Sequence, residues 1–135
     1  MKAIIDASVM GPLLVPDEQH DRSGDVQTLL ACGDAIAPQH WPLEVANLCR
    51  TAIKRGRLEA EVAAARLEDV RRMAVAIDGE TIARLWTETM AVALRHDLTP
   101  YDAAYVELAT RTGLPLFSYD RKLCLAATAA GVGLF

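Results

Sequence analysis

The sequence predicts a three-layer α/β/α domain of the α/β class, whose central sheet is parallel and covered by helices on both faces. Short apolar segments rich in β-branched residues alternate with longer segments whose apolar residues recur at helical spacing. This alternation is typical of parallel strands joined by right-handed helical crossovers. The chain has 135 residues, which is enough for one domain with its own core. We therefore expect residues 1–135 to form a single domain.

The first half of the chain begins with a strand and contains a second one. Residues 2–6 read KAIID, an apolar run that stops abruptly at Asp6, and this pattern predicts a buried strand. Residues 35–37 repeat the pattern more briefly. Gly33 ends the first long helical segment, and Pro42 suits the first turn of the next. The helices expected in this half span residues 21–32, 42–55 and 59–73.

The second half contains three further strand segments and three helices. The strands are expected at residues 74–77, 116–118 and 132–135. The helices are expected over residues 82–96, 99–112 and 121–130, and Thr99 and Pro100 open the second of them. In the first of these helices Trp86, Met90 and Leu94 recur at helical spacing. This stripe predicts a face that packs into the core.

The composition excludes several classes of protein. No uncharged stretch exceeds 13 residues and Asp6 interrupts the first apolar run, so we expect neither a membrane span nor a signal peptide and place the protein in the cytoplasm. Cys32, Cys49 and Cys124 lack the spacing of a disulfide framework or a zinc site, and we interpret all three as small core residues. The net charge of −4 argues against binding to nucleic acid through bulk charge.

Four acidic residues lie at predicted strand ends or helix starts: Asp6, Glu44, Asp102 and Asp120. In a parallel α/β fold these positions share one edge of the sheet, where ligands bind. Each acid also has an ordinary structural role. Asp102 suits a capping box with Thr99, Asp120 suits a helix cap, and Glu44 lies where the helix dipole favours a carboxylate. Taken singly, these structural roles explain the four acids.

The neighbours of the acids favour a shared site. Asp6 is followed by Ser8, Asn47 lies one helical turn after Glu44, and Ser118 precedes Asp120 by two residues. Two carboxylates about 4 Å apart repel by about 4 kcal/mol at an effective dielectric constant of about 20, so a group of four requires a neutralising cation. Ligands that are all oxygen favour Mg²⁺ or Mn²⁺.

Three ordered blocks of the sequence resemble the PIN-domain ribonucleases, and most closely the toxins of VapBC-type toxin–antitoxin pairs. The opening IIDASV is similar to the family's first-strand motif, and WPLEVANLCR is similar to its second-helix motif. The most specific block, LTPYDAAYVELATRTGLPLFSYDRKL, is similar to the long carboxy-terminal signature. Ser118 stands where the family often has Thr, and this difference keeps the hydroxyl. The resemblance covers nearly the whole chain.

The resemblance implies a metal-dependent endoribonuclease. Its catalytic residues, which would also hold one or two Mg²⁺ or Mn²⁺ ions directly or through water, are Asp6, Glu44, Asp102 and Asp120. The ions would activate water for in-line attack on a phosphodiester of RNA. The residues that would orient ligands, water or phosphate are Ser8, Asn47, Thr99 and Ser118. The fourth acid of the motif, which is Asp120 here, varies within the family.

An acidic cleft repels phosphates, so we expect a basic rim near it. The candidates for RNA binding are Arg50, Lys54, Arg55 and Arg57. Arg50 comes six residues after Glu44, which is about 9 Å along the helix axis. An ordinary solvated helix face explains these four residues equally well. Arg121 and Lys122 form a second candidate patch.

As a toxin, the protein would be neutralised by a small VapB-type antitoxin whose tail offers a basic residue to the carboxylates. A hydrophobic fraction of 52% and a mean hydropathy of +0.15 fit a homodimer or a partner-covered surface, and a well-filled core fits them equally. An RNA-processing PIN nuclease without an antitoxin and a catalytically idle interaction module are the alternatives. A phospho-receiver domain would need a second acid beside Asp6, and a haloacid-dehalogenase-type phosphatase would need Asp in place of Ser8.

Overall fold

A four-stranded parallel sheet, in the order β3-β2-β1-β4, forms the centre of the computed structural model, which describes residues 1–135. The strands are β1 (Ala3–Ile5), β2 (Ala35–Ala37), β3 (Val75–Ile77) and β4 (Leu116–Phe117). All residues of β1 and β4 are buried, as their continuously apolar sequences predict. The register pairs Ile5 with Phe117, so the residues that follow these two strands lie side by side.

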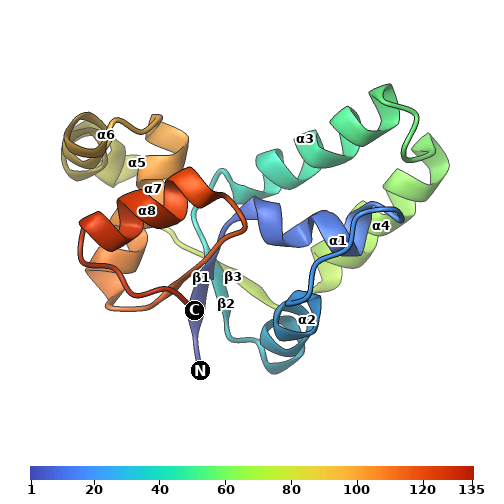
Figure 1. Cartoon of the computed structure of the whole chain (residues 1–135), viewed down its shortest axis with the longest axis horizontal. Coiled ribbons are helices and arrows are strands. Elements are labelled where there is room, and N and C mark those ends of the chain that lie inside the picture. The colour runs from blue at the N-terminus through green and yellow to red at the C-terminus, as the bar shows by residue number, and fades with distance from the viewer.

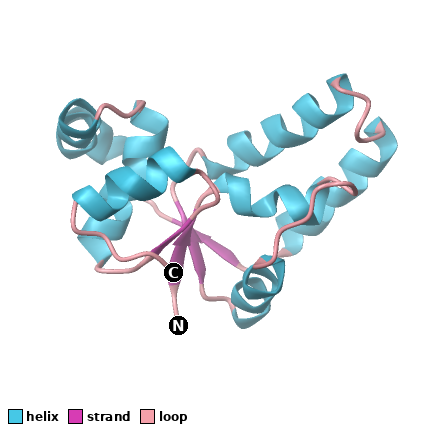
Figure 2. Ribbon diagram, in the orientation of Figure 1, coloured by secondary structure: helices cyan, strands magenta, loops and turns pink.

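Helices connect the strands and cover both faces of the sheet. They are α1 (Gly11–Leu14), α2 (Ser23–Cys32), α3 (Trp41–Lys54), α4 (Ala60–Arg72), α5 (Thr81–Arg84), α6 (Met90–His96), α7 (Pro100–Thr112) and α8 (Arg121–Ala129). A 3₁₀ turn spans Ala7–Met10, and a π-helical turn spans Leu85–Thr89. Helices α1 to α4 lie on one side of the sheet and α5 to α8 on the other (Figures 1 and 2). The predicted three-layer architecture is therefore confirmed.

One cluster of 32 buried apolar residues runs through the sheet and both helix layers. It includes all of β1 and most of the buried face of α7, such as Tyr105, Val106 and Leu108. Helices α3 and α4 extend beyond the sheet as a hairpin arm (Figure 1). The core therefore holds the carboxyl ends of β1 and β4 rigidly, while the tip of the arm lies away from them.

The prediction for the helix at residues 82–96 is wrong in one important respect. The stripe expected to pack into the core faces solvent: Trp86 is 76% exposed, Leu94 79% and Met90 37%. The buried face of this segment instead carries Thr89 and Ala93, whose small side chains let it lie close to α7. Helical periodicity located the apolar face correctly, but periodicity alone does not say what that face contacts.

Smaller differences concern the chain end and the cysteines. The last predicted strand, at residues 132–135, is reduced to a single bridge between Leu116 and Leu134. Cys49 is buried as predicted and Cys124 is half-buried, but Cys32 is exposed on the last turn of α2, so its prediction as a core residue is wrong. None of the helices combines the length and apolar character needed to cross a lipid bilayer.

Candidate active site

The candidate site lies where the chain changes direction across the sheet. The connection from β1 to β2 passes over one face of the sheet, and the connection from β3 to β4, which includes α7, passes over the other face (Figure 1). The two crossovers therefore diverge between the neighbouring strands β1 and β4. In open α/β sheets such a point forms a crevice at the carboxyl ends of the strands. Asp6 directly follows β1 and Ser118 directly follows β4. The sheet register therefore brings together two residues that are 112 positions apart in the sequence.

Asp6 is the buried centre of the site, with only 6% of its surface exposed. The hydroxyls of Ser8 and Ser118 both donate to its Oδ2, at 2.6 and 2.7 Å. Burial raises the pKa of the Asp6 carboxyl, and the nearby charge of Glu44 adds to this, although the two hydroxyls act in the opposite direction. Ser8 also accepts from the Tyr119 backbone N–H, which ties the loop after β4 to the start of the 3₁₀ turn.

Glu44 occupies the first turn of α3, as predicted, and is half-buried. Its Oε1 accepts a hydrogen bond from the Tyr105 hydroxyl at 2.5 Å and lies 3.2 Å from His40 Nε2. Burial alone would raise the pKa of this carboxyl, but hydrogen bonds from His40 and Tyr105 outweigh it and leave the pKa below its usual value. Burial and the charges of Asp6 and Glu44 raise the pKa of Tyr105, so its hydroxyl remains a donor at neutral pH.

Asp102 and Asp120 complete the acidic lining from the starts of α7 and α8. Burial raises the pKa of the half-buried Asp102 to about 6, with further contributions from the negative charges of Asp6, Asp120 and Glu44. Asp120 is exposed and caps α8, because its side chain accepts from the Leu123 backbone N–H. The predicted capping role of Asp120 is confirmed, and the carboxylate still lines the cleft.

The structure brings most of the predicted site residues into one cleft of about 330 Å³. All four acids line it, together with Ser8 and Asn47, and Ser118 reaches it through its hydrogen bond to Asp6. Thr99 has a different place: its hydroxyl caps α7 by accepting from the Asp102 backbone N–H at 3.2 Å, so it positions the start of the helix.

Sequence reasoning missed His40, which lines the same cleft. Its Nε2 lies 3.0 Å from the carbonyl oxygen of Tyr101 and 3.2 Å from Glu44 Oε1, so a proton on Nε2 serves both acceptors. The ring also packs edge-on against Tyr105 at 5.3 Å between centroids. The spacing of four between His40 and Glu44 was a usable signal, because residues four apart on a helix are neighbours.

The donor set of the cleft fits a hard divalent cation. All four acids offer oxygen, and hydroxyls rather than Lys or Arg side chains bind the buried Asp6. No three His, Cys, Asp or Glu side chains are arranged so that they could hold one ion between them. Mg²⁺ commonly takes only one or two carboxylates and keeps several waters, so this spacing suits an ion bound partly through water.

The four residues predicted to form the basic rim have different surroundings in the structure. Arg50 and Lys54 are exposed in the outer half of α3, and Arg55 is exposed directly after its end, towards the tip of the hairpin arm (Figure 1). Arg57 is engaged elsewhere: its guanidinium makes a bidentate contact with Asp17, with Nη2 2.8 Å from Oδ1. In the second candidate patch, the charge of Lys122 lowers the pKa of Asp102, against the larger effects that raise it.

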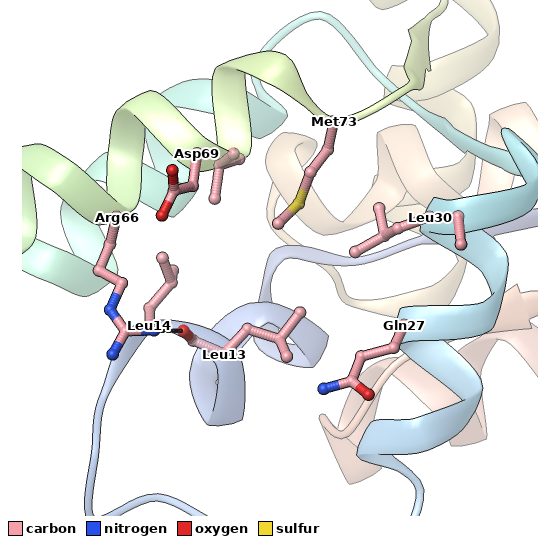
Figure 3. Close-up of a pocket in the computed structure, with 9 residues that line it drawn as sticks. Leu13, Leu14, Gln27, Leu30, Arg66, Asp69 and Met73 are labelled. Carbon is pink, nitrogen blue, oxygen red and sulfur yellow. Dashed lines mark hydrogen bonds between the residues drawn. The ribbon is translucent and has the colours of Figure 1, made fainter.

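A second cavity lies away from the acids, between α1, α2 and α4. It is mostly apolar, and Leu13, Leu30 and Met73 point into it, with Arg66 and Asp69 at its edge (Figure 3). Arg66 donates to the carbonyl of Leu13 and so closes one end of the groove. This cavity contains no group of carboxylates, so it does not compete with the acidic cleft as the catalytic site.

Comparison with known proteins decides the family. The model of the PIN domain family matches residues 3–129. The chain belongs to the PIN-domain family. This PIN domain is 35% identical over 126 residues to "Ribonuclease VapC3" of Pyrobaculum aerophilum, covering 91% of this chain and 92% of that protein. It is also 32% identical over 127 residues to "Ribonuclease VapC3" of Mycobacterium tuberculosis, covering 93% and 87%.

Solved structures share the fold of this PIN domain. PAE2754 from Pyrobaculum aerophilum aligns with a TM-score of 0.70 at 22% identity, over 93% of this chain and 84% of that one. FitAcB from Neisseria gonorrhoeae aligns with a TM-score of 0.64 at 15% identity, over 98% and 96%. VapC20 from Mycobacterium tuberculosis, described as a sarcin-ricin loop cleaving toxin, aligns with a TM-score of 0.62 at 17% identity, over 93% and 95%.

Proposed function

We propose that this PIN domain is a metal-dependent endoribonuclease, the toxin of a type II toxin–antitoxin pair, which hydrolyses RNA phosphodiester bonds and so inhibits translation in the cytoplasm. The observation that carries the proposal is the acidic cleft, where buried Asp6 lies beside Glu44 and Asp102. The relatives named Ribonuclease VapC3 support the same activity. An acidic cleft with hydroxyl donors but no buried Lys or Arg suits a cation-assisted reaction on a phosphate.

The proposed ion would be Mg²⁺ or Mn²⁺, held by Asp6, Glu44, Asp102 and Asp120, with some contacts through water. Such an ion makes water a better nucleophile near neutral pH and stabilises charge on phosphoryl oxygens. The protein's own side chains then have distinct tasks. Ser8 and Ser118 hold the Asp6 carboxylate in one orientation, and Tyr105 and His40 do the same for Glu44. Asn47, which lines the cleft, would orient a phosphate or a water there.

The first test is to sequence the RNA ends produced by the purified protein with Mn²⁺ and with a chelator. We expect cleavage with Mn²⁺ only, and loss of cleavage by at least about a hundredfold in Asp6→Asn. Asp97→Asn is the matched control, because Asp97 lies at the end of α6, outside the cleft, and its left-handed φ of 52° suits Asn. Cleavage that survives the chelator and Asp6→Asn would exclude the metal mechanism, and no cleavage at all would favour an idle interaction module.

The basic rim gives a second test, which separates Arg50 from Arg57. Each phosphate contact to single-stranded RNA contributes about 0.7 to the slope of log affinity against log salt concentration. We expect Arg50→Ala to reduce that slope, whereas Arg57→Ala leaves it unchanged because Asp17 already occupies its guanidinium. Equal slopes in both variants would remove α3 from the proposed RNA path.

We also propose a VapB-type antitoxin as partner, with an apolar segment in the cavity of Figure 3 and a basic tail residue in the acidic cleft. The apolar lining supports the first contact and the unneutralised carboxylates support the second.

Expressed alone, the protein should slow growth, and Asp102→Asn should relieve this. Leu13→Asp should weaken binding of the antitoxin without reducing cleavage. If co-expression with each small protein encoded beside this one leaves the toxicity unchanged, the RNA-processing alternative is favoured.

A homodimer is the last partner we propose, supported by Leu94 on α6, which is 79% exposed. Light scattering should give the mass of a dimer for the purified protein and of a monomer for Leu94→Glu. A monomer at all accessible concentrations would refute this part of the proposal.

A further inference from the structure

The loop between β4 and α8 directs the two serine hydroxyls that bind Asp6. The Tyr119 backbone N–H donates to Ser8 Oγ and the Asp120 backbone N–H donates to Ser118 Oγ, each at 2.9 Å. A hydroxyl has a single proton, so a hydroxyl that accepts from an N–H directs its own proton to another acceptor. For both serines the nearest acceptor is Asp6 Oδ2, at 2.6 and 2.7 Å. The loop therefore sets the direction in which both hydroxyls donate.

The connection between α1 and α2 holds this loop from outside through an aromatic contact. The ring of His20, an exposed residue of that connection, stacks on the ring of Tyr119, with 3.6 Å between centroids and 15° between planes. The Arg22 backbone N–H donates to His20 Nδ1 at 3.3 Å, which favours one orientation of the imidazole. The Arg22 guanidinium lies over the Phe117 ring, 4.6 Å from its centroid. One short stretch of the connection thus covers both aromatic residues beside Ser118.

The ring of Tyr119, rather than its hydroxyl, makes this contact. The hydroxyl is buried and has no hydrogen-bond partner, so it contributes nothing that phenylalanine would lack. The ring stacks on His20 and also meets the Phe117 ring edge-on, with 5.7 Å between centroids. Aromatic pairs in such geometries change an equilibrium by about twofold to tenfold beyond the effect of the area they bury. The contact is therefore strong enough to affect how firmly the loop keeps its two N–H groups in place.

We propose that His20 and Tyr119 are positioning residues for the acidic cleft. Their stacked rings hold the loop after β4, and the two N–H groups of the loop keep the Ser8 and Ser118 hydroxyls directed at Asp6. Because Asp6 is one of the proposed ligands of the ion, the inference rests on the proposed function. His20 forms no hydrogen bond or ion pair with the acids of the cleft, so it acts on the site only through Tyr119. A histidine that only shielded the core would change stability and leave ion binding unchanged.

Amide hydrogen exchange, followed by NMR in chelator, tests the contact without metal or RNA. His20→Ala should speed the exchange of the Tyr119 and Asp120 amides by about threefold or more, while the amides of β1 keep their rates. His20→Phe keeps an aromatic ring at this position and should restore the wild-type rates. Gln19→Ala is the matched control, because Gln19 is the exposed neighbour of His20 in the same connection.

Substitutions of Tyr119 separate the ring from the hydroxyl. Tyr119→Phe removes only the unpartnered hydroxyl, so exchange of the Asp120 amide should stay at the wild-type rate and stability should be unchanged or greater. Tyr119→Leu removes the stacked ring and should speed exchange of the Asp120 amide as His20→Ala does. Equal exchange in the two Tyr119 variants would show that the ring does not hold the loop, and would overturn the proposal.

Titration with Mn²⁺, measured by calorimetry, tests the consequence for the ion. His20→Ala and Tyr119→Leu should bind Mn²⁺ about threefold more weakly, whereas His20→Phe and Tyr119→Phe should bind it as the wild-type protein does. The reason is that apparent affinity falls with the fraction of molecules in the form that binds.

Three further results would overturn the proposal: unchanged exchange of the two amides in His20→Ala, exchange that rises equally in β1, or a loosened loop with unchanged Mn²⁺ affinity. A wild-type protein that binds no Mn²⁺ would instead refute the proposed metal dependence. The exchange rates, which are measured in chelator, would still confirm or refute the hold of His20 on the loop.

Discussion

Asp102→Asn should make the metal-free protein more stable at neutral pH. The pKa of Asp102 is raised from 3.8 to about 6 by burial and by the charges of Asp6, Asp120 and Glu44. A folded-state pKa above the unfolded value means that ionised Asp102 costs folding free energy. The full difference corresponds to about 3 kcal/mol, but Asp102 is only half-buried and solvent screens part of the repulsion. We therefore expect about 1 to 1.5 kcal/mol of stabilisation.

The sign of the pH dependence follows from the same shift. Below pH 3.8 Asp102 is protonated in both the folded and the unfolded state, so the wild-type protein and the variant should differ little. Between pH 3.8 and about 6 the folded state binds the proton more tightly, and the wild-type protein progressively loses stability relative to the variant as pH rises. Above about pH 7 the whole difference is present. Asp97→Asn, outside the cleft, should show no such trend.

Urea denaturation in chelator, repeated from pH 4 to pH 8, measures this difference directly. Near neutral pH the variant should also melt about 3 to 5 °C above the wild-type protein. Millimolar Mg²⁺ should stabilise the wild-type protein more than Asp102→Asn, because a cation that binds only the folded state relieves the repulsion. The reasoning would be refuted by a variant that is equally or less stable than the wild-type protein at pH 7.5 in chelator.

Substitutions at three further positions, two beside the cleft and one in a buried ion pair away from it, are tested by denaturant unfolding. Tyr105→Phe removes the 2.5 Å hydrogen bond to Glu44 and should cost about 1 to 2 kcal/mol; unchanged stability would show that water replaces it. Arg111→Met leaves the buried Glu107 without its 2.9 Å partner and should cost about 3 kcal/mol, more than any exposed ion pair. Ser118→Ala should cost about 1 kcal/mol, and Ser118→Thr, which keeps the hydroxyl, should not.

The site residues that lie at a strand end or a helix start could be predicted from sequence. Asp6 ends an apolar strand, and Glu44 and Asp102 open helices, so a parallel α/β fold puts them at one edge of the sheet. The contact between Asp6 and Ser118 required more, namely that β1 and β4 are neighbours in register. Nothing in the local sequence fixes that pairing, which depends on the order of crossovers in the whole chain.

Residues that act through distant partners were less predictable. Tyr105 donates to Glu44 across 61 positions of sequence, and His40 contacts the backbone of Tyr101 across the same separation. The apolar stripe from Trp86 to Leu94 has the spacing of a core-facing helix, yet the structure exposes it and buries Thr89 instead. Hydropathy reports that a face is apolar, and only the three-dimensional packing shows whether it meets the core, a partner or a ligand.

The distribution of positive charge supports the proposal that the cleft binds a cation from outside the chain. Elsewhere in the molecule carboxylates are matched by guanidinium groups, as in the contacts of Arg111 with Asp78 and of Arg57 with Asp17. In the cleft no Lys or Arg side chain pairs with the acids: His40 Nε2 lies 3.2 Å from Glu44 Oε1, and hydroxyls bind Asp6. Hydroxyls orient a carboxylate without cancelling its charge, so the repulsion that raises the pKa of Asp102 persists until a cation binds. An arginine in the cleft would remove that repulsion and, with it, the affinity for a divalent ion.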